Sequence, residues 1–392
     1  MKWRNKGKEL ELYAESLQLN KSIDIYIFGC GLIGDRIGKV LKDCDVFKGY
    51  IDNDIKKQGD KKWGREIYPL DTFLQNKNKA YIVIAASKIN VKIIECQLKE
   101  CGLLHGKDYF FATEFIQRIW PVIYTYLYNK IFVELAQICL TERCTLTCKK
   151  CAHACYAVTK DAEDMPLEMV YKSADSFFLK VDYVQEFVLI GGEPLLYNEL
   201  FESIEYIGER YRKQMDVFSI TTNGTILPSE EVLQACKKYD VTFRISNYSL
   251  QLPKLRKHYM RLINALEEYG ISYSFGEEER EWMDFGFECV NREGTEEELI
   301  KVFSSCNTPC REVRGNKYYY CVMARSVSEN LGLNVGKDDY LDLDKLIGDD
   351  YKKELLEFSL GYSHKGYLDM CRYCRGNEAK NYPIPAAEQV ER

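Results

Sequence analysis

The chain has 392 residues, of which 46% are hydrophobic and 29% are charged, and its formal net charge is −6. This length suits two or three domains, and the acidic balance argues against a nucleic-acid partner because few cations are left to neutralise phosphates. No stretch is apolar over a membrane-spanning length and residues 1–18 lack a signal-peptide core, so we expect a cytoplasmic protein without a membrane partner. The sixteen cysteines are then better candidates for metal ligands or catalytic groups than for disulfides.

The first part of the chain, residues 1–115, alternates between strand and helix patterns. We expect these elements to be strands at 23–28, 47–51 and 81–86 and helices through residue 41 and at 91–101. Strand, glycine-rich turn, helix and strand in this order predict a parallel, doubly wound α/β sheet. The sequence therefore predicts an N-terminal Rossmann-like domain.

A GxGxxG motif joins the first strand to the first helix of this domain. Gly29 allows the tight turn, Gly31 lets phosphates approach the backbone, and Gly34 allows the helix to pack closely on the strand. Asp52 ends the second strand, where an acid binds a ribose hydroxyl. These four residues are candidates for nucleotide binding, and a scaffold without a ligand is the alternative.

Residues 116–134 are rich in aromatic side chains and predict a helical connector, after which βα units repeat over residues 135–290. We expect strands at 133–140, 186–190, 217–221 and 241–246 and helices at 166–180, 197–211 and 229–238, with a long helix ending before residue 270. Repeated βα units without a central break predict a full or partial barrel.

Three cysteines with the spacing Cx3Cx2C follow the first strand of these units. Thiolates from Cys144, Cys148 and Cys151 can each bind a different iron of one [4Fe–4S] cubane, which leaves the fourth iron without a protein ligand. The alternative is a zinc site, with His153 or Cys155 as the fourth ligand.

A second motif, Gly191-Gly192-Glu193-Pro194, closes the strand at 186–190. This is the carboxyl end of a strand, where the active sites of barrels form. Backbone groups exposed by the glycines, together with the Glu193 carboxylate, offer a site for the ammonium group of an amino acid.

Together the two motifs resemble the radical S-adenosylmethionine (SAM) superfamily over residues 135–275. The resemblance implies a partial (β/α)6 barrel whose cluster binds SAM through its methionine amine and carboxylate. It further implies that the reduced cluster cleaves SAM to methionine and a 5′-deoxyadenosyl radical, which abstracts hydrogen from a substrate. It also implies a flavodoxin or ferredoxin as electron donor.

The same resemblance assigns further residues to SAM. Glu193 matches the position that contacts the methionine amine, and Ser246 matches the ribose contact. Asn223 lies in the recurrent Thr-Asn-Gly turn after the third strand. Arg256 or Lys254 is a candidate for the SAM carboxylate by its spacing.

The last part of the chain, residues 291–392, is expected to be polar and irregular, and it holds five cysteines: Cys306, Cys310, Cys321, Cys371 and Cys374. They resemble the SPASM or shorter twitch extensions of radical SAM enzymes, which hold auxiliary [4Fe–4S] clusters. Five cysteines are too few for two further clusters, so we expect one, with either Cys306 or Cys310 completing the ligand set. A structural zinc knuckle is the alternative.

An auxiliary cluster near a substrate suits oxidation of an alcohol, as in aminocyclitol dehydrogenases with a twitch extension. Return of hydrogen from a thiol gives epimerisation instead, and Cys289 and Cys155 are candidate donors. The N-terminal domain favours a sugar, nucleotide-sugar or glycan substrate. The alternatives are modification of a ribosomally made peptide and a non-catalytic protein that binds an iron–sulfur cluster or zinc.

Overall fold

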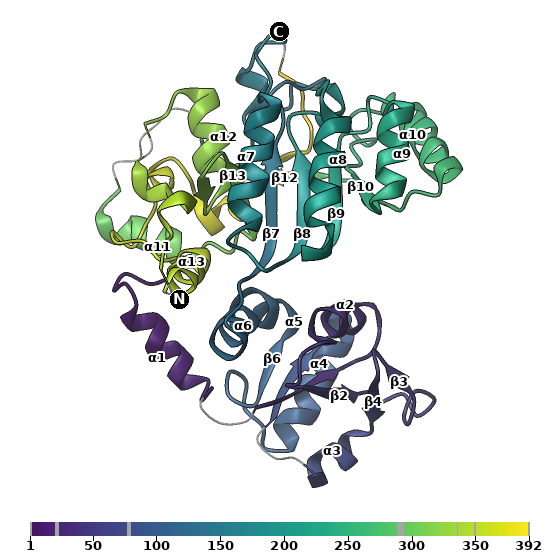
Figure 1. The fold of residues 1–392 in the computed structure, drawn as a ribbon, viewed down its shortest axis with the longest axis vertical. Coiled ribbons are helices and arrows are strands. Elements are labelled where there is room, and N and C mark those ends of the chain that lie inside the picture. The colour runs from purple at the N-terminus through teal and green to yellow at the C-terminus, as the bar shows by residue number, and fades with distance from the viewer. Residues whose placement is uncertain are drawn as a thin grey trace. The chain divides into compact units, whose positions relative to one another are not determined.

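The computed structural model describes residues 2–19, 23–76, 80–287, 294–334, 336–348 and 350–390. The chain forms two compact units, one of Leu10–Asn129 and one of Met1–Glu9 with Lys130–Arg392. Both units combine helices with largely parallel sheets (Figure 1), which confirms the predicted α/β class. None of the described helices is both long and apolar enough to cross a membrane. The expected domain bounds at 115, 134 and 290 stay predictions.

The unit of Leu10–Asn129 contains a six-stranded sheet in the order β3-β4-β2-β1-β5-β6. Its strands are β1 (Asp24–Phe28), β2 (Phe47–Ile51), β3 (Lys61–Lys62), β4 (Arg65–Tyr68), β5 (Ala80–Ile84) and β6 (Tyr109–Phe111). Its helices are α2 (Leu32–Leu41), α3 (Leu70–Asn76), α4 (Lys88–Glu100), α5 (Ala112–Glu114) and α6 (Trp120–Tyr128), and α1 (Lys8–Ser16) leads into it. All paired neighbours are parallel except β3 and β4. Strands β2, β3 and β4 lie on one side of β1, and the later strands β5 and β6 lie on the other side, as the doubly wound prediction requires.

The other unit contains an eight-stranded sheet in the order β11-β10-β9-β8-β7-β13-β14-β15. Its strands are β7 (Phe132–Cys139), β8 (Tyr183–Ile190), β9 (Met215–Thr222), β10 (Val241–Ile245), β11 (Tyr273–Phe275), β13 (Cys310–Arg314), β14 (Lys317–Tyr319) and β15 (Tyr340–Asp342). A separate hairpin pairs β12 (Glu281–Met283) with β16 (Pro383–Pro385). The large sheet is open, and its strands from β7 to β11 are parallel, as a partial barrel requires.

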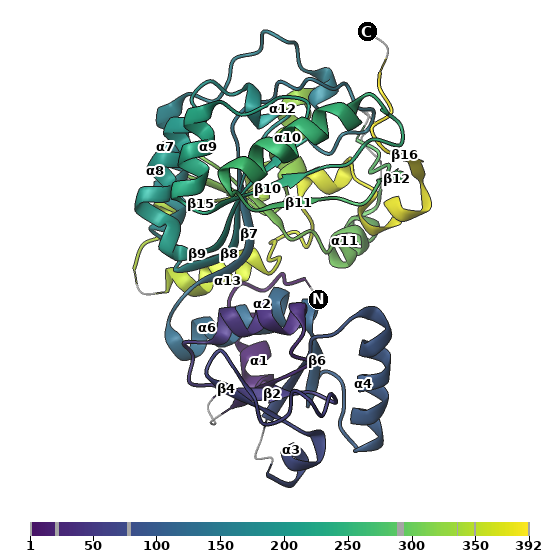
Figure 2. The same ribbon diagram turned by 90° about the vertical axis from the view of Figure 1, so that its right-hand side faces the viewer.

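The two faces of this sheet differ in chemistry. Aromatic side chains such as Phe187 and Phe218 are fully buried on one face, and Figure 2 shows helices α7, α8 and α9 along that side. The other face carries a polar set, because the Glu186 carboxylate accepts hydrogen bonds from Ser219 Oγ at 2.7 Å and from Arg244 Nη1 at 3.1 Å. The helices of the unit are α7 (Leu167–Phe178), α8 (Leu200–Tyr211), α9 (Glu230–Lys238), α10 (Leu255–Tyr269), α11 (Glu296–Ser305), α12 (Val322–Leu331) and α13 (Tyr351–Ser359).

The expectation of an irregular last region is wrong. Strand β13 pairs in parallel with β7, with Cys310 opposite Leu135, and the β14–β15 hairpin extends the sheet further. These strands are only three to five residues long, too short to show a periodic pattern. Pairing with a distant part of the chain stabilises them, and Val313 and Tyr318 are fully buried there.

Candidate functional site

The loop after β7 brings the Cx3Cx2C cysteines together. Cys144, Cys148 and Cys151 pack in one cluster with Leu146 and Ala387. Burial raises the pKa of the Cys144 and Cys148 thiols to about 12. Buried and half-buried thiols that pack in one cluster on one short loop fit a metal group that binds their deprotonated form.

The glycines of the Gly191-Gly192-Glu193-Pro194 motif allow this loop to lie against the end of β8. A Cβ atom on Gly192 would lie 2.3 Å from the carbonyl oxygen of Arg143. The amide N–H groups of Gly192 and Glu193 donate to the carbonyls of Thr141 and Arg143 at 2.8 and 2.9 Å. These two N–H groups therefore hold the cysteine loop against the end of β8.

Glu193 is fully buried and held by three hydrogen bonds from the chain. Its Oε1 accepts from Thr222 Oγ1 at 2.7 Å and from the N–H of Leu195 at 3.1 Å, and its Oε2 accepts from the N–H of Asn223 at 2.8 Å. Burial raises the pKa of this carboxyl to about 7. A carboxylate offers about four acceptor positions, so one on Oε2 is left for a cation.

The turn after β9 contacts the cysteine loop directly. The Asn223 side-chain amide donates to Thr145 Oγ1 at 3.1 Å and lies 3.5 Å from Cys144 Sγ. Thr222, which sequence analysis missed, links this turn to Glu193. The only feature of the sequence that could have indicated this role is the position of Thr222 directly before Asn223 and Gly224.

The remaining residues predicted for this site have varied positions. Cys155 is buried, and its hydrogen bond to Cys151 lowers the pKa of Cys151. Ser246 follows β10, and its N–H donates to the carbonyl of Thr222. Arg256 is exposed and pairs with a surface glutamate. Cys289 lies outside the described residues.

A second group of cysteines surrounds a cavity of about 320 Å³ in the last part of the chain. Its cysteine lining consists of Cys306, Cys321, Cys371 and Cys374. Cys306 ends α11, which a capping box of Thr295 and Glu298 begins. Four thiols from three separate segments around one cavity fit the ligand set of a metal cluster.

Backbone N–H groups point at the sulfurs of this second group. Cys321 precedes α12, and the N–H groups of Met323 and Ala324 partly oppose the rise that burial causes in the pKa of its thiol. Cys374 Sγ accepts from the N–H of Gly376 at 3.2 Å. Such donors stabilise thiolate sulfur.

Cys310, the other candidate for this ligand set, lies elsewhere. It begins β13, opposite Leu135 of β7. Burial raises the pKa of its thiol, which interacts electrostatically with Arg311 and Arg244. It is not among the residues that line the cavity.

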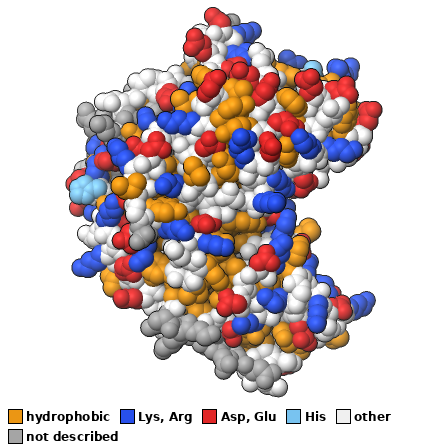
Figure 3. Space-filling view, viewed as in Figure 1, with side chains coloured by type: hydrophobic (Ala, Val, Ile, Leu, Met, Phe, Trp, Pro, Cys, Tyr) orange, Lys and Arg blue, Asp and Glu red, His pale blue; other side chains and the backbone are white. Residues whose placement is uncertain are grey.

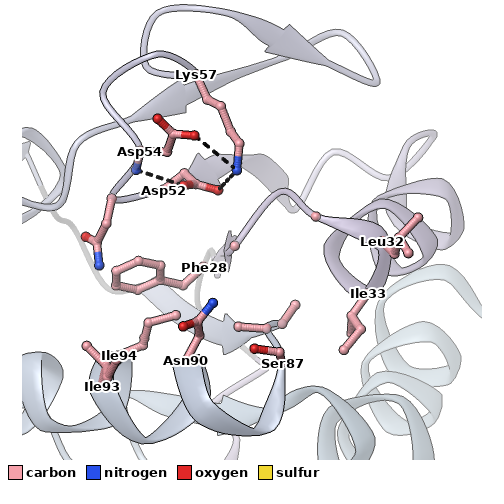
Figure 4. A pocket seen from close by; sticks show the side chains of 15 residues that line it. Phe28, Leu32, Ile33, Asp52, Asp54, Lys57, Ser87, Asn90, Ile93 and Ile94 are labelled. Atoms are coloured by element: carbon pink, nitrogen blue, oxygen red, sulfur yellow. Dashed lines mark hydrogen bonds and ion pairs between the residues drawn. The ribbon is translucent and has the colours of Figure 1, made fainter.

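The glycine turn of the Leu10–Asn129 unit borders a cavity of about 710 Å³ (Figure 4). Gly29, Gly31 and Asp52 line it. Gly34 packs beside the turn, since a Cβ atom there would lie 1.8 Å from the Gly29 oxygen. Asp52 Oδ2 accepts from the N–H of Cys30 at 3.0 Å, which ties the acid to the turn.

Charged side chains of both signs are interspersed over the face drawn in Figure 3. In the part of the chain that the structure describes, Cys139, Glu142 and His153 also bring three possible metal-ligand atoms within 4.8 Å of one another. Arg325 forms an ion pair with Glu142 of this group and a second one with Glu312. The Arg325 cation opposes binding of a metal ion there.

Comparison with known proteins identifies the domain that contains the cysteine loop. The family model of the Radical SAM superfamily matches residues 138–275. These residues form a radical SAM domain, and such a domain implies a [4Fe–4S] cluster and SAM. The three thiols of the loop fit that cluster and leave its fourth iron open to SAM.

Solved structures that resemble the chain include several radical SAM proteins. BtrN in complex with AdoMet and 2-DOIA is 18% identical, with a TM-score of 0.40 and coverage of 67% of this chain and 98% of that chain. SuiB of Streptococcus suis bound to SAM is 18% identical, with a TM-score of 0.29 and coverage of 40% and 35%. The enzyme anSMEcpe with bound AdoMet is 17% identical, with a TM-score of 0.30 and coverage of 36% and 43%, so the alignment spans under half of its length. No curated protein matches the sequence.

Proposed function

We propose that this protein oxidises or epimerises a sugar or nucleotide-linked sugar by radical SAM chemistry, with a second [4Fe–4S] cluster bound in its last part. The observation that carries the proposal is the cavity lined by Cys306, Cys321, Cys371 and Cys374. When bound, the first cluster with SAM supplies one-electron cleavage of a C–H bond, and a second cluster supplies an acceptor for the electron that oxidation releases.

The residues of the chain bind and orient the reactants in this proposal. Cys144, Cys148 and Cys151 hold the first cluster, and Glu193 Oε2 accepts from the SAM ammonium. Asn223 keeps the turn after β9 against the cysteine loop, through its bond to the loop at 3.1 Å. Arg256 is too exposed, with 63% of its side chain accessible, to be favoured as the carboxylate partner of SAM.

Two features support a sugar as the substrate. The polar face of the large sheet offers the hydrogen-bonded set of Glu186, Ser219 and Arg244, which suits a molecule with several hydroxyl groups. The cavity beside Gly31 and Asp52 has the size of a small-molecule site and by itself suits a nucleotide. We therefore assign the Leu10–Asn129 unit as a Rossmann-like domain.

Release of 5′-deoxyadenosine tests this function. The anaerobically reconstituted protein, reduced by a flavodoxin or ferredoxin, is incubated with SAM and with panels of nucleotide-sugars, glycans and small peptides. We expect release that depends on a sugar, and none from Cys144→Ala. Release with peptides alone would overturn the sugar assignment and support peptide modification.

A further inference from the structure

Residues 383–390 form a strap across the loop of the Cx3Cx2C motif. One end is anchored where β16 pairs with β12. At the other end the N–H of Lys149 donates to the Glu388 carbonyl at 2.6 Å, and the N–H of Val390 donates to the Thr147 carbonyl at 2.7 Å. An ion pair of 2.6 Å between Lys149 Nζ and Glu388 Oε1 adds to these bonds.

The strap places the carboxamide of Gln389 against a cysteine of the motif. Gln389 Nε2 donates to Cys148 Sγ at 3.2 Å and to the carbonyl of Ala387 at 2.7 Å. Gln389 Oε1 accepts from the N–H of Thr147 at 2.7 Å. Cys148 is only 8% exposed and Ala387 is fully buried, so the contact is largely shielded from water.

The surroundings fix which atom of this amide faces the sulfur. In the reversed orientation the Oε1 atom would face the carbonyl oxygen of Ala387, and the NH₂ group would face the N–H of Thr147. Both contacts would be repulsive, because each would join two acceptors or two donors. The group that faces Cys148 is therefore a donor.

A hydrogen-bond donor at this sulfur interacts with the negative charge of the metal group that the sulfur binds. Hydrogen bonds to cysteine sulfurs are among the factors that set the reduction potential of an iron–sulfur cluster. The reduced cluster carries one more negative charge than the oxidised cluster, so an N–H···S bond stabilises the reduced form more. The protein supplies this donor from a segment 241 residues further along the chain.

We propose that Gln389 is a positioning residue that raises the reduction potential of the first cluster through its hydrogen bond to Cys148. This inference rests on the proposed cluster at Cys144, Cys148 and Cys151. It assigns a role to the strap that neither the radical SAM domain at 138–275 nor the second group of cysteines provides.

The test compares Gln389→Met and Gln389→Glu with the wild type. Met has a similar length and no N–H donor, and Glu keeps an oxygen for the N–H of Thr147 while it places negative charge near the sulfur. The reconstituted proteins are held at a fixed ambient potential with dithionite and viologen mediators. The readout is the ratio of reduced to oxidised cluster, from the EPR signal that shifts when SAM is added.

The matched control is Gln251→Met. Gln251 Nε2 donates to the carbonyl of Arg280 at 3.0 Å, the same carbonyl that accepts from the N–H of Ala386 in the strap. This variant perturbs the anchor of the strap without removing a donor from a sulfur. It therefore distinguishes the effect of the hydrogen bond on the cluster from the effect of altered packing of the strap.

We expect the ratio of reduced to oxidised cluster to fall about threefold to tenfold in Gln389→Met, which corresponds to part of the free energy of one hydrogen bond to a charged group. The ratio should fall further in Gln389→Glu and stay unchanged in Gln251→Met. Equal ratios in wild type and Gln389→Met, or an equal fall in Gln251→Met, would overturn the inference. If Gln389→Met does not bind the first cluster, the wild type is compared with Gln389→Glu instead, and equal ratios in these two proteins would overturn the inference. Absence of a SAM-sensitive signal from the wild type would instead contradict the proposed function.

Discussion

The choice between Cys306 and Cys310 gives the sharpest prediction, because the two cysteines are four positions apart and only one lines the cavity. In the proposed function, three thiols on the β7 loop and four around the cavity each hold one cluster. Each cubane holds four irons, so the reconstituted wild type should contain about eight irons per chain. Replacing Cys306 by Ala removes one of the four thiols of the cavity site, and the iron content should fall toward about four. Replacing Cys310 by Ala should leave about eight.

Iron and acid-labile sulfide per chain, measured after anaerobic reconstitution, form the assay. The double variant Cys371→Ala/Cys374→Ala calibrates complete loss of the second site, at about four irons. Circular dichroism confirms that each variant is folded. A loss of iron in Cys310→Ala with none in Cys306→Ala would refute the reasoning from the cavity. Zinc in place of the second set of irons would remove the support for redox chemistry at that site.

Three further predictions concern the scaffold of the two sites. In Gly192→Ala the new Cβ atom would lie 2.3 Å from the Arg143 oxygen, so the free energy of unfolding in urea titrations should fall by about 1–3 kcal/mol and iron retention should weaken. In Gly31→Ala no atom lies within 4 Å of the new Cβ, so the free energy of unfolding should fall less. Equal effects of the two variants would contradict the steric argument. Because burial raises the pKa of Glu193 to about 7 and only the carboxylate attracts an ammonium, SAM affinity in equilibrium binding should weaken as the pH falls from 8 to 6, and Glu193→Gln should bind weakly with a flat profile; a pH-dependent variant would exclude Glu193 as the group responsible. Burial also raises the pKa of Asp339 to about 7 from an ordinary value of 3.8, so the folded state holds this proton over a range where the unfolded state has lost it, and the stability it contributes falls as the pH rises from about 4 to about 7. The difference in unfolding free energy between wild type and Asp339→Asn should therefore shrink over that range, and a growing difference would reverse the assigned sign.

Much of the fold follows from local sequence patterns. The run of apolar residues at 23–28 and the glycine turn after it predict β1 and the start of α2, because neighbours in sequence decide both. The same reasoning fails for β13 and β14, which were expected to be irregular. These strands exist because β7, more than 170 residues earlier, offers a free edge. A strand of three to five residues carries too little pattern to predict its partner.

The sequence by itself predicted the first cysteine site, since three thiols within eight residues of one loop can reach a single cluster. Only the tertiary structure decided the second site, where Cys306 lines a cavity that Cys310 does not reach. It also decided the contact of Gln389 with Cys148, which are 241 residues apart. The physical reason is common to both cases. Short-range geometry is fixed by backbone connectivity, whereas the meeting of distant segments depends on how strands, helices and hairpins pack, and spacing in the sequence carries no record of that.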